Sequence, residues 1–331
     1  MTHEIYGIIW YNLLTILWVG FIVFESFTSG VGMILKTARN EKEGRLLQYT
    51  VGPYWDGSQV WFITAGGATF AAFPVVYADV FSNLYVALYL LLVMLITRGI
   101  SMELDYKDEN PKWQQGMAWA WVISSYGLAL LLGVRFTNLF LKANTLPASV
   151  NDFWGLLSKP GILGGLLFIA LYRTSGILWA NLKAKGEAVT RLRKQSLYTA
   201  IAAAVIMPML MLAFNWDSNL LTTNFQELPL LWILPILAML LPVATILALL
   251  KDWYQTAFCT NVASMALFMI VGFVGVFPYM APGITFTDGM ASHLTLRIMT
   301  LVVLIFLPVV LFYQGWKFWK FREKHDVSYF D

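Results

Sequence analysis

The sequence is poor in charged residues and in cysteine, and each scarcity excludes a class of protein. Only 12% of its 331 residues are charged and 59% are apolar, whereas about a quarter of a soluble domain is charged. The single cysteine, Cys259, excludes an internal disulfide, and we expect it to be a small packing residue. This composition indicates a polytopic membrane protein.

Histidine is scarce as well. His3 and His325 fall in the terminal segments, and His293 falls just before the last apolar run. Haem iron is commonly held by histidine, and the sequence contains neither a Cys-x-x-Cys-His motif nor a His-rich helix. We therefore expect no metal site, no catalytic residue and no cofactor bound by this chain alone. Nucleic-acid-binding motifs are also missing, so we expect no nucleic-acid partner.

Long apolar runs predict nine membrane-spanning helices. They lie near residues 7–28, 57–77, 80–98, 117–140, 161–182, 196–215, 229–250, 258–278 and 295–318. A very short turn around Ala78 and Asp79 is expected to join the second span to the third. The connections are too short for a soluble module, so residues 1–331 are predicted to form a single polytopic domain of the all-α class.

The distribution of lysine and arginine predicts the orientation of these spans. Of the 22 basic residues, 17 fall on one side of the membrane, two fall on the other, and three lie within spans. Cytoplasmic loops carry an excess of Lys and Arg. The N-terminus is therefore predicted to lie outside and the C-terminus in the cytoplasm, which requires an odd number of spans. The start of the chain has no basic segment, so we expect no cleavable signal peptide.

Two acids lie at or within the predicted spans, where a charge is costly and often functional. Glu25 falls in the cytoplasmic half of the first span, and Asp56 falls at the cytoplasmic start of the second. Both are candidates for relaying protons taken up from the cytoplasm. The alternative for Asp56 is a residue that complements the dipole of a helix N-terminus. The alternative for Glu25 is a buried contact with another subunit.

Basic residues near the spans suggest further contacts. Arg98 and Glu103 follow the third span and are expected to form a cytoplasmic charge pair, with Asp105 nearby, unless they belong to a solvated cluster. Arg173 lies near the middle of the fifth span. We expect it to face a partner acid, an anionic cofactor group or a water cavity.

The stretch from Trp55 to Pro74 is the most informative part of the chain. It begins Trp-Asp-Gly, and its middle is rich in alanine and glycine, which permit close packing of helices in membranes. Trp61 lies one turn inside this span, beside small residues, and is expected to pack against a neighbouring helix.

The pattern Trp-Asp-Gly-x-x-Val-Trp-x-Ile-Thr-Ala-Gly-Gly-Ala-x-Phe-Ala-Ala-Phe-Pro, at residues 55–74, resembles the signature of subunit II of cytochrome bd quinol oxidase. Residues 20–32, 98–103 and 294–313 are similar to other segments of that family. The resemblance covers the whole chain and is strongest up to residue 105.

The resemblance implies a fold and an assembly. The fold is two four-helix bundles plus one peripheral helix. The partner is subunit I, which is expected to hold two b-type haems and one d-type haem, and a small accessory subunit is a further expected partner. The complex would take electrons from a membrane quinol and reduce dioxygen to water in the aerobic respiratory chain of a prokaryotic plasma membrane. Because it draws protons from the cytoplasm, it would build a proton gradient.

The resemblance also implies roles for single residues. The acid of the family's first helix and the Asp of Trp-Asp-Gly are proposed to deliver protons, and they match Glu25 and Asp56. The second Trp of the motif, Trp61 here, lies in a region proposed to guide oxygen in some members. Many members have a second acid in the first helix, where this chain has Thr28. This difference and the short connection at residues 215–228 favour a divergent branch, such as the cyanide-insensitive type.

Two alternatives to an oxidase subunit are kept. Secondary transporters often carry ionisable residues within their spans, and Glu25 and Arg173 would suit one without a redox role. A purely structural scaffold, whose acids only contact the partner, is the other.

Overall fold

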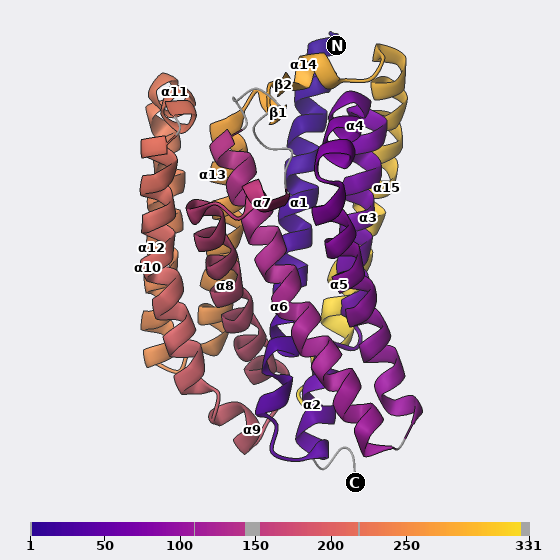
Figure 1. Cartoon of the computed structure of the whole chain (residues 1–331), viewed down its shortest axis with the longest axis vertical. Helices are drawn as coiled ribbons and strands as arrows, with labels where there is room; N and C mark the ends of the chain where they lie inside the picture. Colours follow the sequence, from indigo (N-terminus) through magenta and orange to yellow (C-terminus); the bar gives the residue numbers. More distant parts are fainter. Residues whose placement is uncertain (1, 109, 143–152, 218, 326–331) are drawn as a thin grey trace.

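The computed structural model describes residues 2–108, 110–142, 153–217 and 219–325. Long helices dominate it and run roughly along the long axis of the molecule (Figure 1). The long helices are α1 (His3–Ile34), α3 (Trp55–Ala72), α5 (Tyr85–Leu104), α6 (Pro111–Lys142), α8 (Lys159–Lys183), α10 (Arg193–Asp217), α12 (Ile233–Leu250), α13 (Tyr254–Val276) and α15 (His293–Lys320).

Shorter elements lie at the two ends of the molecule. In Figure 1 the N-terminus, α4, α11 and α14 are at the top, and α2 and α9 are at the bottom. The short helices are α2 (Glu41–Val51), α4 (Pro74–Asn83), α7 (Phe153–Leu156), α9 (Glu187–Thr190), α11 (Asn219–Glu227) and α14 (Phe286–Gly289). The single turns of 3-10 helix among the described residues are η1 (Leu35–Thr37), η2 (Asp105–Lys107) and η4 (Pro229–Trp232). Strands β1 (Tyr279–Ala281) and β2 (Ile284–Thr285) form a small antiparallel hairpin, which the sequence did not predict.

The predicted all-helical membrane class is confirmed. In the described part of the chain, eight helices are long and apolar enough to cross a membrane, and the number rises to nine if the bent pair α3 and α4 is one span. Each of these eight helices overlaps one of the predicted spans. Their ends are set by ordinary helix signals. Thr2 and Ser158, for example, cap the starts of α1 and α8 by accepting backbone N–H groups.

The predicted turn at Ala78 and Asp79 was wrong. Helix α3 ends at Ala72, and α4 leaves it at an angle of 119°, so Ala78 and Asp79 lie inside a helix of ten residues. The break falls at Pro74, which has no N–H to continue the hydrogen-bond ladder of α3 but suits the first position of a new helix. As a result, the third span begins only at Tyr85.

Helix α1 lies at the centre of the packing. It contacts α3, α6, α8 and α13, and α8 in turn contacts α6, α10 and α13. Figure 1 shows α1 running through the middle of the molecule, with α15 along one edge and α10 and α12 along the other. Most side chains of α15 are exposed, and only Leu296 and Lys317 are buried.

The crossing of α1 and α8 is close enough to bring backbone against backbone. A Cβ atom added to Gly30 would lie 2.1 Å from the carbonyl oxygen of Tyr172, and one added to Gly176 would lie 2.0 Å from the carbonyl carbon of Gly30. No side chain fits between the helices here. The two glycines therefore fix how far α1 and α8 approach each other.

An ion pair outside the spans ties α2 to the segment between α9 and α10. The carboxylate of Glu43 accepts a hydrogen bond of 2.7 Å from Nη2 of Arg191 and one of 2.8 Å from the backbone N–H of Arg39. The bond from Arg191 is the main reason that the pKa of Glu43 is lowered from its ordinary value of 4.5.

The substitution Gly176→Ala is expected to destabilise the protein, because its methyl group would overlap the backbone of α1. We expect a loss of about 1–3 kcal/mol, as is usual for overpacking, seen as a lower thermal unfolding midpoint. Gly116→Ala in α6 is the control, since a Cβ there meets nothing within 4 Å. Equal midpoints for the two variants would contradict the backbone contact.

Stability is expected to depend on pH through Glu43. Its lowered pKa means that the pair stabilises the folded state above the ordinary pKa of 4.5, and this contribution disappears as the pH falls through the folded-state pKa. Glu43→Gln should remove that part of the acid sensitivity, measured as the unfolding midpoint between about pH 3 and pH 6. Glu41→Gln, whose pair with Arg45 is exposed, should leave the pH profile unchanged.

Candidate functional site

The structure surrounds the Glu25 carboxylate with hydrogen-bond donors. Glu25 is fully buried on α1, and its Oε1 accepts from the hydroxyl of Ser29, one turn further along the helix. Its Oε2 accepts from the Ser58 hydroxyl at 2.9 Å and from the Gln59 amide at 3.2 Å. Both of these residues lie in the first turns of α3. Glu25 therefore joins α1 to the start of the Trp-Asp-Gly helix.

Arg98 supplies the countercharge of Glu25. Its side chain on α5 is fully buried, and Nη1 forms an ion pair with the carboxylate. The same nitrogen lies 3.1 Å from the Ser29 hydroxyl and 3.3 Å from the Thr28 hydroxyl. Three helices thus meet at one buried charge pair. A neutral hydroxyl stands at position 28, so the guanidinium pairs with a single carboxylate.

The predicted pair of Arg98 with Glu103 was wrong. Five positions separate the two residues, which at 3.6 residues per turn directs them to different faces of α5. Arg98 points inward and is buried, whereas Glu103 is exposed at the end of the helix. Asp105, expected nearby, instead accepts a hydrogen bond of 2.7 Å from the Gln48 amide of α2.

Asp56 lies at the mouth of the same site. Its side chain is 67% exposed, and it pairs with the amine of Lys317 on α15 at 2.9 Å. Asp56 also accepts from the backbone N–H of Gly57, within the first turn of α3. Two residues further along, Ser58 reaches Glu25. The first turn of α3 therefore carries an exposed acid and a donor to the buried acid.

Trp61 packs as expected against a neighbouring helix. Its ring contacts Gly20 of α1, where an added Cβ would come within 2.3 Å of the indole. Its ring centroid is 5.4 Å from that of Phe24. The side chain is 9% exposed, so it fills the interface between α1 and α3 close to Glu25, which directly follows Phe24.

Comparison with known proteins gives a consistent match over nearly the whole chain. The family described as Cytochrome bd terminal oxidase subunit II matches residues 6–321. The chain belongs to this family. It is 31% identical to the cytochrome bd-I ubiquinol oxidase subunit 2 of Escherichia coli strain K12, over 96% of this chain and 94% of that one. It is 30% identical to the cytochrome bd ubiquinol oxidase subunit 2 of Bacillus subtilis strain 168, over 96% of each chain.

The fold agrees with the family. The structure matches that of the bd oxidase from Geobacillus thermodenitrificans with a TM-score of 0.76 and 17% sequence identity, covering 95% of this chain and 98% of that one. As a bd oxidase subunit II, the chain is part of an oxidoreductase complex with subunit I, in the plasma membrane of a bacterium. The alternative of a transporter is not favoured by any of these matches.

The bd oxidase family is a haem-containing complex. Among the described residues of this chain, no group of three or more His, Cys, Asp and Glu side chains could hold a metal ion. The rings of His3 and His293 lie 6.0 Å apart, where the starts of α1 and α15 meet. His325 follows α15 at the other end of the molecule and stacks edge-on against Tyr49.

Arg173 meets neutral acceptors rather than an acid. Its Nη1 donates to the Tyr126 hydroxyl and, at 3.2 Å, to the carbonyl of Met33. Its Nη2 donates to the Gln195 amide oxygen at 2.6 Å. The expected anionic partner is therefore replaced by uncharged groups from three other helices. Cys259, expected to be a packing residue, is exposed instead.

Sequence reasoning missed several members of this bd oxidase site. Ser29 could have been found, because it lies four residues after Glu25 and so on the same face of the helix. Ser58 and Gln59 follow Asp56 within one turn. Lys317 gave no separate signal, since it was one of many basic residues that indicate orientation.

Removing one charge of the buried Glu25–Arg98 pair is expected to destabilise the protein strongly, whereas removing both charges is not. Arg98→Met leaves Glu25 buried without its countercharge, which should cost about 3–5 kcal/mol of stability. The double substitution of Arg98→Met with Glu25→Leu should recover most of that loss, because an apolar pair of similar volume needs no compensation. The measurement is the thermal unfolding midpoint of the purified complex. A double variant no more stable than Arg98→Met alone would contradict the pair.

Proposed function

We propose that this chain forms a heterodimer with a haem-bearing subunit I that oxidises a membrane quinol and reduces dioxygen to water. The main support for this proposal is the match to ubiquinol oxidase subunits over nearly the full length of the chain. The histidines of this chain lie at the helix ends, which supports assigning the two b-type haems and the d-type haem to subunit I. A small accessory subunit is part of the same proposal.

We further propose two four-helix bundles with α15 as the peripheral helix. The contacts of α1 with α3 and α6, and of α5 with α6, support one bundle. The contacts among α8, α10, α12 and α13 support the other. The N-terminus outside and the C-terminus in the cytoplasm follow from the excess of basic residues at the end that carries α2 and α9.

The main proposal for this chain is that Asp56 and Glu25 take protons from the cytoplasm. Asp56 is exposed, whereas Glu25 is fully buried. In this proposal Asp56 is the outer proton acceptor and Glu25 is the inner one. Ser58 and Gln59 follow Asp56 in the first turns of α3 and donate to Glu25, so the same part of α3 carries the outer acid and two donors to the inner one. Hydroxyl and carboxylate groups in hydrogen-bonding contact can pass protons between them.

Each of the two acids has a basic partner. Glu25 pairs with Arg98 in the buried interior, where both side chains are fully buried, and Asp56 pairs with Lys317 at the mouth.

Trp61 has a packing role in this proposal. Its contact with Gly20 and Phe24 holds α3 against α1, which keeps the Ser58 hydroxyl in reach of Glu25. A part in an oxygen route is the other role implied by the family resemblance, and unchanged oxygen-binding kinetics in a Trp61→Phe complex would separate packing from oxygen guidance.

Neutral isosteres of the two acids test the proton proposal. In the assembled complex, Glu25→Gln and Asp56→Asn should each lower quinol-driven oxygen uptake roughly tenfold or more, because a proton-transfer group is lost. Haem content, read from the reduced-minus-oxidised spectrum, shows that the complex has still assembled.

Asp252→Asn is the matched control. Asp252 lies in an exposed ion pair with Arg193 at the turn between α12 and α13, so its loss should leave turnover unchanged. Normal oxygen uptake together with normal proton uptake in both acid variants would refute a proton-transfer role while leaving the family assignment intact.

A further inference from the structure

A group of buried hydrogen-bond donors lies beside the Glu25–Arg98 pair. Nε and Nη2 of Arg98, the indole N–H of Trp121 and the hydroxyls of Ser125 and Tyr172 are buried, and within the described part of the chain they have no hydrogen-bond partner. Buried polar groups in native proteins are nearly always paired, with protein or with ordered water. Several such groups in one place therefore indicate a bound acceptor.

These donors gather around one face of α1. Glu25, Ser29 and Gly32 follow one another at helical spacing, so they share a face. The guanidinium is bound at the first two of these residues. At the third, a Cβ added to Gly32 would lie 2.5 Å from Nε1 of Trp121 and 2.2 Å from Oγ of Ser125. The glycine leaves room for both polar groups beside the helix.

The Tyr172 hydroxyl is supplied by α8. It is fully buried, and the charges of both Glu25 and Arg98 act on it. The backbone carbonyl of Tyr172 lies against Gly30, where α1 and α8 approach closely. The unpaired groups thus come from α5, α6 and α8, and each of these helices reaches α1 between Glu25 and Gly32.

We propose that this cluster binds ordered water inside the helix bundle. The donor set requires an acceptor, and charge decides between water and an anion. Arg98 is already compensated by Glu25, so an added anion would leave a net negative charge buried, which is costly. Water is uncharged, accepts from two donors and can donate to the Ser125 and Tyr172 oxygens in return.

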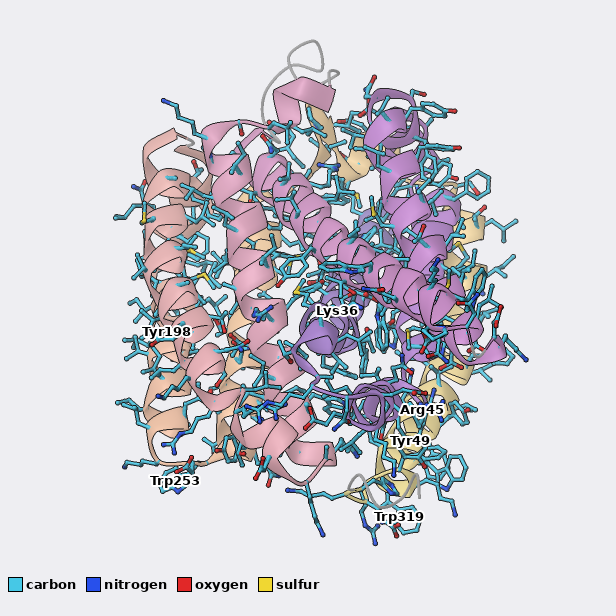
Figure 2. All side chains as sticks on the ribbon, turned by 60° about the horizontal axis from the view of Figure 1, so that its bottom comes forward. Lys36, Arg45, Tyr49, Tyr198, Trp253 and Trp319 are labelled. Carbon is cyan, nitrogen blue, oxygen red and sulfur yellow. The ribbon has the colours of Figure 1, made fainter. Side chains whose placement is uncertain are left out.

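The bound water has a source in the polar cavity at the α2 end. That cavity has a volume of about 800 Å³, and its lining includes Lys36, Arg45, Tyr49 and Trp121. Figure 2, which brings this end of the molecule forward, shows the side chains of Lys36, Arg45 and Tyr49 around α2. One indole ring therefore borders both the cavity and the cluster. This proposal concerns hydration alone and does not depend on proton transfer through Glu25.

A density map of the intact complex with subunit I tests the proposal directly. At a resolution that shows ordered solvent, we expect density within hydrogen-bonding distance of at least two of the four donor residues. The map should be the same in chloride buffer and in gluconate buffer. Density that appears only in chloride would identify an anion and overturn the proposal, as would a map without density at the donors.

Removing single donors provides a second test. If water is bound, Tyr172→Phe and Ser125→Ala each remove a satisfied hydrogen bond and should lower the unfolding midpoint by about 2 °C or more. If the groups are truly unpaired, the same substitutions relieve a penalty and raise the midpoint. An unchanged or higher midpoint in both variants would overturn the proposal.

Thr137→Val is the matched control. The Thr137 hydroxyl is also buried without a partner among the described residues, but it lies twelve residues from Ser125 on α6, or about 18 Å along the helix. Its replacement by an isosteric apolar side chain should leave the midpoint unchanged or raise it. In the Tyr172→Phe complex, the density beside residue 172 should also weaken or shift.

Discussion

The buried charges of Glu25 and Arg98 impose the strictest constraint on how the first half of the chain can pack. Their ion pair joins α1 to α5, and the donors from Ser58 and Gln59 bring α3 to the same point. Burying two charges is costly unless each is paired and hydrogen-bonded. The packing of three helices must therefore bring these groups together within hydrogen-bonding distance, so the pair constrains the arrangement of the first half of the chain.

The sequence predicted the helices well because lipid imposes a simple rule: a spanning helix needs a long apolar run. It failed at the second span, where the apolar run continues through Pro74 although the helix turns by 119°. A hydropathy profile measures how well side chains dissolve in lipid. It does not record that proline lacks the backbone N–H that a continuous helix needs. The proline itself was visible and was the better guide to where the helix ends.

The site was predictable in part. Glu25 and Asp56 stood out because charges near the membrane interior are rare, and the family motif supported both. The partner of Arg98 was not predictable from spacing along the chain, since the contact joins residues 73 positions apart. Opposite charges at similar depth in two spans were a usable signal. Lys317 was hidden among basic residues whose positions already had an explanation in topology.

The glycine contact between α1 and α8 limits which parts of the structure can move near Glu25. Gly30 lies little more than one turn from Glu25, and its backbone rests directly on that of α8. Helices in such contact cannot slide past each other without a collision of main-chain atoms. Adjustment around Glu25 is then left to its side-chain neighbours, such as the hydroxyls of Ser29 and Ser58. The backbones of α1 and α8 therefore keep their relative position, while the side chains between them can still rearrange.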